Sequence, residues 1–199
     1  MTTPQPDREI HDLFDRTLKH LFTLSLAMII GAINGIFHTD YPLNSEVIFE
    51  NTEEISDDLD KLISDIKIRI NKRDRFIIEA EIDPNKPIAL KIFREAFEDA
   101  LRNKINDDGV IRFPFPDVCV IYFEPNSQTP DIVTIRIEAQ DGRSFDYAVP
   151  SFKPTEHSLQ ELSDRNLDIF LPFCILKFRK RLEKCKPTLI TLRSPKKCA

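Results

Sequence analysis

Glycine is scarce in this sequence: the 199 residues contain only four, and no two of them stand closer than four positions. Glycine-rich phosphate loops need more glycines at closer spacing, because the backbone must turn tightly and approach the phosphate. Neither G-x-G-x-x-G nor G-x-x-x-x-G-K-[ST] occurs in the chain. The scarcity therefore excludes dinucleotide binding and nucleotide hydrolysis that depend on these loops.

Cysteine is also rare, and the four present are far apart, with no C-x-x-C pair and no neighbouring histidine. Two of them lie in the apolar runs VCVIYF and LPFCIL, which predicts small core hydrophobes. This spacing argues against zinc binding and against a disulfide framework. The first residues, MTTPQPDREIHD, lack the basic-then-apolar pattern of a secretory signal. We expect reduced thiols and a cytoplasmic protein.

The charge is unevenly distributed. Residues 177–199 carry nine Lys or Arg and one acid, a net of +8, whereas residues 1–176 carry a net of −13. A carboxylate-rich site beside a phosphate-contacting arm explains this asymmetry, and so does an ordinary solvated chain end. We expect one domain over residues 1–182 and a basic tail over 183–199.

The longest stretch without a charge is LFTLSLAMIIGAINGIF, seventeen residues at positions 21–37. This is the lower limit for a membrane span, roughly 17–25 residues. Polar residues interrupt the stretch and histidines flank it, which favours a buried helix and no membrane partner. Gly31 and Gly35 within it would allow another segment to approach closely.

Hydrophobic spacing predicts the remaining elements. Apolar residues at three- and four-residue steps predict helices over 7–19, 21–37, 88–103, 157–162 and 166–182, the last interrupted by Pro172. Alternating apolar and polar residues predict strands over 46–50, 63–70, 75–82, 117–124, 132–139 and 144–149. This order of helices and strands is that of a mixed α/β or α+β domain.

The hairpin formed by 63–70 and 75–82 holds the first candidate site. Asp65 lies on the polar face of one strand, and Glu79 and Glu81 lie on the polar face of the other. Carboxylates that converge in this way need a compensating charge, and Mg²⁺, which prefers carboxylate oxygens, supplies it. Separate solvation of each acid, or pairing with Lys67 or Arg69, explains the pattern as well.

The first predicted helix adds a second cluster. Asp15 and Lys19 stand four residues apart and share one helix face, and Asp12 lies three residues before Asp15. An ordinary salt bridge within the helix is an equally good explanation.

Taken together, the ordered segments of the chain resemble the recombination-promoting nucleases, which are transposase-like proteins of the PD-(D/E)XK nuclease superfamily. The resemblance spans about residues 11–180 and is carried by HDLFDRTLKHLFTLS, AINGIFHTDYPLNSEVIF, ISDIKIRI, IIEAEI, KIFREAFEDALRNK, PDVCVIYF, TPDIVTIRI, SFDYAVPSFK and LPFCILKFRK. It implies a restriction-endonuclease-like core, in which a helix, a three-stranded meander, a second helix, further strands and a C-terminal helix follow one another. It also implies Mg²⁺-dependent cleavage of DNA phosphodiester bonds, with Mn²⁺ as a substitute.

The resemblance also implies roles for individual residues. The Asp of the superfamily corresponds to Asp65, and its (Glu/Asp)-x-Lys corresponds to Glu79-Ala80-Glu81. The last position is usually Gln in this branch, and here it is Glu81. The acidic position of the first helix falls on Asp15.

Lys19 matches a further family position. The implied catalytic residues are therefore Asp65, Glu79, Glu81, Asp15 and Lys19, and the implied metal ligands are Asp65, Glu79 and Asp15. Lys19, Lys67 and Lys91 are candidates for the cation that stands in for the missing lysine.

Three hypotheses about function follow. The first is a metal-dependent DNA endonuclease associated with recombination or mobile elements. The second is a catalytically weakened or inactive nuclease fold that binds nucleic acid or protein. The third is a structural protein that forms a homodimer through the glycine face of the helix over 21–37.

Overall fold

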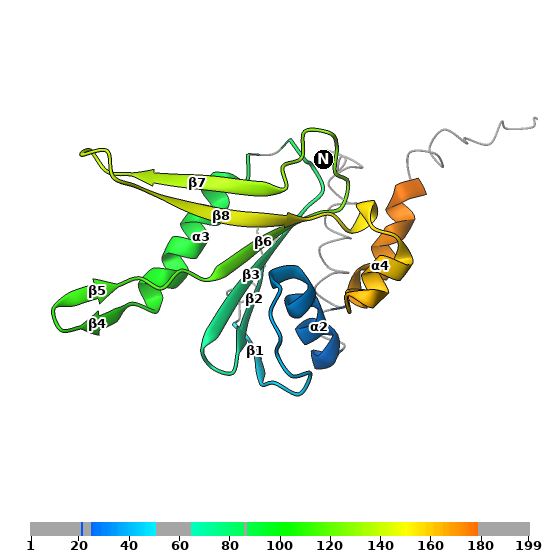
Figure 1. The fold of residues 1–199 in the computed structure, drawn as a ribbon, viewed down its shortest axis with the longest axis horizontal. Coiled ribbons are helices and arrows are strands. Elements are labelled where there is room, and N and C mark those ends of the chain that lie inside the picture. The colour runs from blue at the N-terminus through cyan, green and yellow to red at the C-terminus, as the bar shows by residue number, and fades with distance from the viewer. Residues whose placement is uncertain (1–20, 22–24, 51–64, 86, 179–199) are drawn as a thin grey trace, which may run out of the picture.

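The computed structural model describes residues 21, 25–50, 65–85 and 87–178, which form a mixed α+β structure around a six-stranded sheet (Figure 1). Its elements, in chain order, are α2 (Leu26–Phe37), β1 (Val47–Phe49), β2 (Asp65–Ile70), β3 (Asp74–Glu81), α3 (Ala89–Arg102), β4 (Ile105–Asp107), β5 (Val110–Arg112), β6 (Asp117–Tyr122), β7 (Ile132–Glu138), β8 (Ser144–Phe152), η2 (Pro154–Glu156), α4 (Leu159–Asp164) and η3 (Asp168–Phe178), where η denotes a 3-10 helix.

The sheet has the order β1-β2-β3-β6-β8-β7. The first three strands form an antiparallel meander, and β6 then pairs parallel to β3. A parallel pair cannot be joined by a tight turn, and α3 lies in the crossover that this geometry requires. β8 continues parallel to β6, and β7 pairs antiparallel to β8 at the edge.

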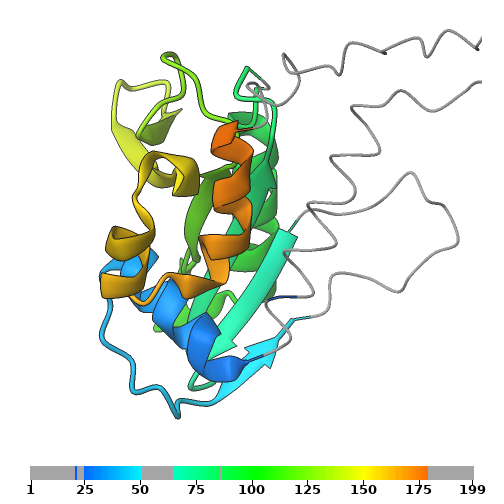
Figure 2. The same ribbon diagram turned by 90° about the vertical axis from the view of Figure 1, so that its right-hand side faces the viewer.

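One face of the sheet packs against α2 and η3, as Figure 2 shows with these helices in blue and orange. Alternate residues of β2 and β3 point to this face, because successive side chains of a strand leave on opposite sides. The strand residues of this core are Ile66, Ile68, Ile70, Phe76, Ile78 and Ala80.

The opposite face packs against α3. Ile88, Ile92 and Ala96 recur at four-residue steps and bury one stripe of this helix against β3, β6 and β8. The two remaining buried positions of β3 on this face are Glu79 and Glu81. The α3 side of the sheet therefore combines an apolar core with buried acids.

The glycines of α2 allow a close contact within the chain. A Cβ at Gly35 would lie 2.7 Å from the carbonyl oxygen of Arg165, and one at Gly31 would lie 2.8 Å from that of Asn166. Arg165 Nη2 also donates to the Gly35 carbonyl at 2.8 Å. The glycine face of α2 is thus covered by the turn between α4 and η3, and the homodimer stays a prediction.

Within the described residues, no helix has both the length and the apolar character that crossing a membrane requires. Cys119 and Cys174 are buried, as their apolar surroundings predict. Burial raises the pKa of Cys119 to about 12, so this thiol stays protonated at neutral pH.

The expected strands and the helices expected over 88–103 and 157–162 are confirmed to within three residues at their ends, but one hairpin was missed and one helix differs in type. The β4–β5 hairpin was not anticipated. The helix expected over 157–162 runs from Leu159 to Asp164, because Ser158 forms a capping box with Glu161. The helix expected over 166–182 is a 3-10 helix over 168–178. The helix expected over 7–19 lies outside the described residues.

Candidate functional site

The register of the β2–β3 hairpin places Asp65 directly opposite Glu79. Residues opposite each other in an antiparallel pair have Cβ atoms about 4.5–5.5 Å apart. The sequence-based prediction that these two positions meet across the hairpin is therefore confirmed for the backbone. The side chain of Asp65 lies outside the described part of the structure.

Glu79 is buried beneath α3 and forms an ion pair with a lysine of that helix. Its side chain is 1% exposed, and its Oε2 lies 2.7 Å from Nζ of Lys91. The side chain of Lys91 is 27% exposed, so the lysine reaches Glu79 from the surface. Lys91 Nζ also lies 3.9 Å from Oε1 of Glu95, one turn further along the helix.

Lys91 belongs to a polar stripe on α3. Residues four apart share a helix face, and this stripe consists of Lys91, Glu95, Asp99 and Asn103. The stripe meets charged residues of β2 and β3. Asp99 pairs with Arg75 at 3.1 Å, and Asn103 Oδ1 accepts a hydrogen bond from Nη2 of Arg69 at 3.2 Å.

The stripe and the strands therefore form a layer of alternating charges between α3 and the sheet. Burial raises the pKa of Asp99, while the positive charges of Arg75, Lys67 and Arg69 lower it. Of the three lysines considered from the sequence, Lys91 makes the described contact with Glu79. Lys67 lies near Asp99, and Lys19 lies outside the described residues.

Glu81 lies two residues beyond Glu79 on the same face of β3, at the end of the strand. Its Oε1 accepts hydrogen bonds from the backbone N–H groups of Ile82 and Asp83, both at 3.0 Å. Burial and the negative charge of Glu81 both raise the pKa of Tyr122 on the neighbouring strand. Glu81 thus shapes the turn that leaves the sheet.

The part of the chain that the structure describes holds no group of three or more His, Cys, Asp or Glu side chains arranged to bind a metal ion. Asp15 and the side chain of Asp65 lie outside that part. Of the three predicted ligands, the side chain that the structure describes is therefore that of Glu79, with Glu81 two residues further along the strand. Its carboxylate oxygens belong to the donor class that Mg²⁺ prefers.

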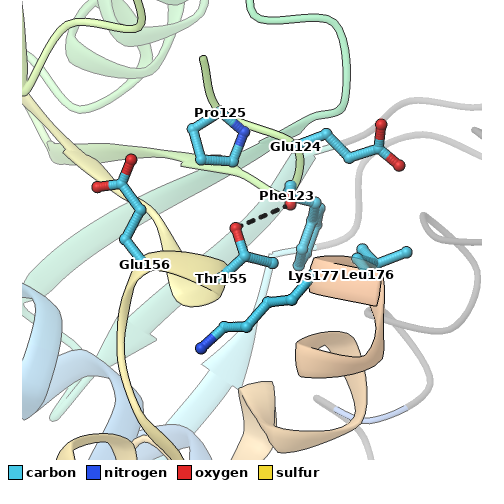
Figure 3. Close-up of a pocket in the computed structure, with 7 residues that line it drawn as sticks. All are labelled: Phe123, Glu124, Pro125, Thr155, Glu156, Leu176 and Lys177. Carbon is cyan, nitrogen blue, oxygen red and sulfur yellow. Dashed lines mark hydrogen bonds between the residues drawn. The ribbon is translucent and has the colours of Figure 1, made fainter. Parts of the chain in front are cut away.

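A hollow with a volume of about 300 Å³ lies near the carboxyl ends of the parallel strands (Figure 3). In open sheets, this edge is where ligands bind most often. Its polar side chains are Glu124, Glu156, Thr155 and Lys177. Thr155 donates a hydrogen bond to the Phe123 carbonyl at 3.2 Å.

This hollow could not be found from the sequence, because its lining comes from three distant segments that carry no motif. The ammonium group of Lys177 donates to the carbonyl of His157. The N–H of Phe123 donates to the Glu81 carbonyl at 3.1 Å, but the hollow lies beside η3, whereas Glu79 and Lys91 lie on the α3 side of the sheet.

No family model, no curated protein and no solved structure matches this chain. The family resemblance of its segments therefore stays a prediction. Because unrelated functions share the same folds, the fold alone does not assign a function to this chain.

Proposed function

We propose that this chain is a metal-dependent DNA endonuclease that hydrolyses phosphodiester bonds, with a restriction-endonuclease-like core and a role in recombination or in mobile elements. The observation that carries the proposal is the register of β2 and β3, which sets Asp65 opposite the buried Glu79. Two acids on adjacent strands, one of them held beside a lysine, are a suitable starting point for metal-assisted hydrolysis.

The element order supports the same proposal. The antiparallel meander β1-β2-β3 is followed by α3 and then by β6, which is parallel to β3. This is the succession of meander, helix and further strand that the family resemblance implies. Both acids of the Glu79-Ala80-Glu81 segment lie near the carboxyl end of β3, where the chain leaves the sheet.

Asp65, Glu79 and Asp15 would hold the metal ion. When bound, Mg²⁺ lowers the pKa of a coordinated water and neutralises charge on the phosphate. Within the chain, Lys91 supplies a positive charge beside Glu79, at a site where β3 itself carries Glu81 in place of a lysine. Glu81 maintains the exit of the chain from the sheet through two backbone hydrogen bonds.

Cleavage of supercoiled plasmid DNA in Mg²⁺ or Mn²⁺ tests the proposal. We expect Asp65→Ala and Glu79→Gln to abolish nicking while circular dichroism shows an unchanged fold. Glu98→Gln is the matched control, because Glu98 lies on α3 but is about half exposed and pairs with Arg102. Full activity of both site variants would refute the endonuclease.

A second candidate function is an inactive nuclease fold that binds nucleic acid or protein. The observation that favours it is that both buried acids are already engaged within the chain, Glu79 by Lys91 and Glu81 by two backbone N–H groups. Such a module needs no metal to compensate its charges. Calorimetric titration with Mn²⁺ distinguishes the two, because the inactive module shows no saturable binding that Glu79→Gln removes.

DNA binding is tested separately through the basic tail. If the tail contacts phosphates, the logarithm of the binding constant falls linearly with the logarithm of salt concentration, with a slope of about −0.9 per phosphate. Deletion of residues 183–199 then reduces that slope. An unchanged slope means that the tail does not contact DNA.

A further inference from the structure

We propose that Lys91 is an internal counter-ion that competes with the divalent cation for Glu79, so that metal binding requires the lysine to leave the carboxylate. The inference rests on the proposed function, because it assumes that Glu79 is a metal ligand. It adds a regulatory property to the site. Without metal, the positive charge of Lys91 neutralises the Glu79 carboxylate, and the metal ion must displace Lys91 in order to bind.

The first argument is burial. The Glu79 side chain is 1% exposed, and a carboxylate in such a place is strongly destabilising unless a positive charge accompanies it. Lys91 provides that charge at 2.7 Å from Oε2. A divalent cation bound at the same carboxylate would provide it as well. Both charges at once would repel each other across a short distance with little screening.

The second argument is that the Lys91 side chain can move away from Glu79. Its side chain is 27% exposed, and Oε1 of Glu95 lies 3.9 Å from its ammonium group, one helical turn away. A lysine carries its charge on a flexible four-carbon chain, so the ammonium can move toward Glu95 and the solvent while the helix stays in place.

A neighbouring ion pair of the same interface shows the contrast. Arg75 and Asp99 also join β3 to α3, but both side chains are only 8% exposed. The guanidinium group of Arg75 additionally donates to the carbonyl of Pro114. Arg75 is therefore enclosed at its ion pair, whereas the side chain of Lys91 reaches the surface and can exchange.

Titration of the full-length chain with Mn²⁺, with the free ion followed by electron paramagnetic resonance, tests the inference. We expect Lys91→Met to bind Mn²⁺ about tenfold more tightly than the wild type, because a unit charge beside the ligand is removed. Glu79→Gln should lose the site. Lys104→Met is the matched control for charge, since Lys104 is exposed beyond the far end of α3, and its affinity should equal that of the wild type.

The shift in unfolding temperature that Mn²⁺ produces is a readout that a merely structural lysine would not change. Without metal, Lys91→Met should unfold at a lower temperature than the wild type, because Glu79 loses its counter-ion. Added Mn²⁺ should raise this temperature more in Lys91→Met than in the wild type, while Lys91→Arg should respond like the wild type. If the metal-free variant is unfolded, its refolding on addition of Mn²⁺ supports the inference, and failure to refold overturns it.

The outcomes separate the inference from the proposed function. If Lys91→Met binds Mn²⁺ no more tightly than the wild type while Glu79→Gln abolishes binding, the competition is refuted and the metal site stands. If neither the wild type nor Lys91→Met shows saturable binding that depends on Glu79, the metal site itself is refuted, and the inference with it.

Discussion

Arg75 and Asp99 form a buried ion pair between β3 and α3, with Nη1 and Oδ2 3.1 Å apart. Burial raises the pKa of Asp99 even though the charge of Arg75 lowers it, so the attraction does not fully compensate the loss of hydration. In this respect the pair resembles many buried salt bridges, which hold a geometry without adding net stability.

Removing one partner of this pair should therefore be far more harmful than removing both. We expect Arg75→Met to lower the free energy of unfolding by about 3–5 kcal/mol, and Arg75→Met combined with Asp99→Leu to recover most of that loss. Urea denaturation of the two variants and the wild type measures the difference. Equal losses in the single and double variants would mean that the pair stabilises the fold by itself.

The cost of Arg75→Met should also depend on pH. The folded-state pKa of Asp99 lies above its unfolded value, so its contribution to stability is fully present below the unfolded pKa and is lost as the pH rises through the folded pKa. Loss of Arg75 raises the folded pKa further and enlarges the penalty at neutral pH. The destabilisation should therefore be smaller at pH 4 than at pH 7, and a pH-independent cost would contradict this account.

The glycines of α2 provide a test of the packing on the other face of the sheet. Alanine is favoured over glycine in a helix by about 1 kcal/mol, yet a Cβ at Gly35 would lie 2.7 Å from the Arg165 carbonyl and 2.8 Å from Leu167 Cδ2. We expect Gly35→Ala to lower the free energy of unfolding by about 1–3 kcal/mol, the usual cost of overpacking.

Gly142→Ala is the matched control for that substitution. Gly142 has a φ of 86° and no atom within 4 Å of an added Cβ, so alanine there meets only backbone strain of about 1–2 kcal/mol. The Gly35 variant should show a local rearrangement of residues 165–167 in amide hydrogen exchange, and the Gly142 variant should not. Stabilisation by Gly35→Ala would contradict the close contact between α2 and the α4–η3 turn.

The β2–β3 hairpin was predictable because apolar side chains occupy alternate positions on both strands, and this period alone fixes which side chains share a face. The partner of Glu79 was only partly predictable. The sequence shows Lys91 at the start of a helix, but the parallel placement of β6 is what brings that helix over the acids. The β4–β5 hairpin was missed because its strands have three residues each, too few for a period to appear.

The positions of Glu95 and Asp99 also could not be predicted fully from the sequence. Their four-residue spacing from Lys91 is visible in the sequence and indicates one helix face, but an amphipathic helix ordinarily turns such a face to solvent. Only the register of β3 shows that Arg75 and Glu79 stand beneath it. Position in the fold, rather than residue type, distinguishes these buried charges from surface ones.

Asp117 offers a test of carboxylate electrostatics at the other end of the central strands, where β6 begins. Asp117 lies at the exposed start of β6, where partial desolvation and the negative charge of Asp74 both raise its pKa, and Asp74 accepts a hydrogen bond from Tyr41 at 2.9 Å. The ionised form of Asp117 is therefore disfavoured by folding. Its stabilising contribution is present at low pH and is lost as the pH rises through the raised pKa.

We expect Asp117→Asn to unfold at a higher temperature than the wild type at pH 7, with the difference disappearing near pH 3. Asp146→Asn is a control of opposite sign, because its hydrogen bond to Arg136 lowers the pKa of Asp146. That variant should be the less stable one at pH 7, and the difference should decrease as the pH falls through the lowered pKa of Asp146. Thermal scans across this pH range compare the two variants. A change in unfolding temperature of the same sign at pH 7 for both variants would contradict the opposite pKa shifts of Asp117 and Asp146.

Glu81 has two separable roles, and one residue change distinguishes them. Its Oε1 accepts hydrogen bonds from the N–H groups of Ile82 and Asp83, and an amide oxygen can accept the same two bonds. We therefore expect Glu81→Gln to retain the stability of the wild type in urea denaturation, whereas Glu81→Ala should lose about 1–3 kcal/mol, because two hydrogen bonds to partly buried backbone N–H groups are lost.

The second role of Glu81 is electrostatic. Glu81 lies two residues from Glu79 on the same face of β3, about 7 Å along the strand. A negative charge at this distance attracts a cation bound at Glu79, so Glu81→Gln should weaken Mn²⁺ binding while leaving the fold intact. A titration that gives the wild-type affinity for Glu81→Gln would mean that Glu81 serves only the backbone turn.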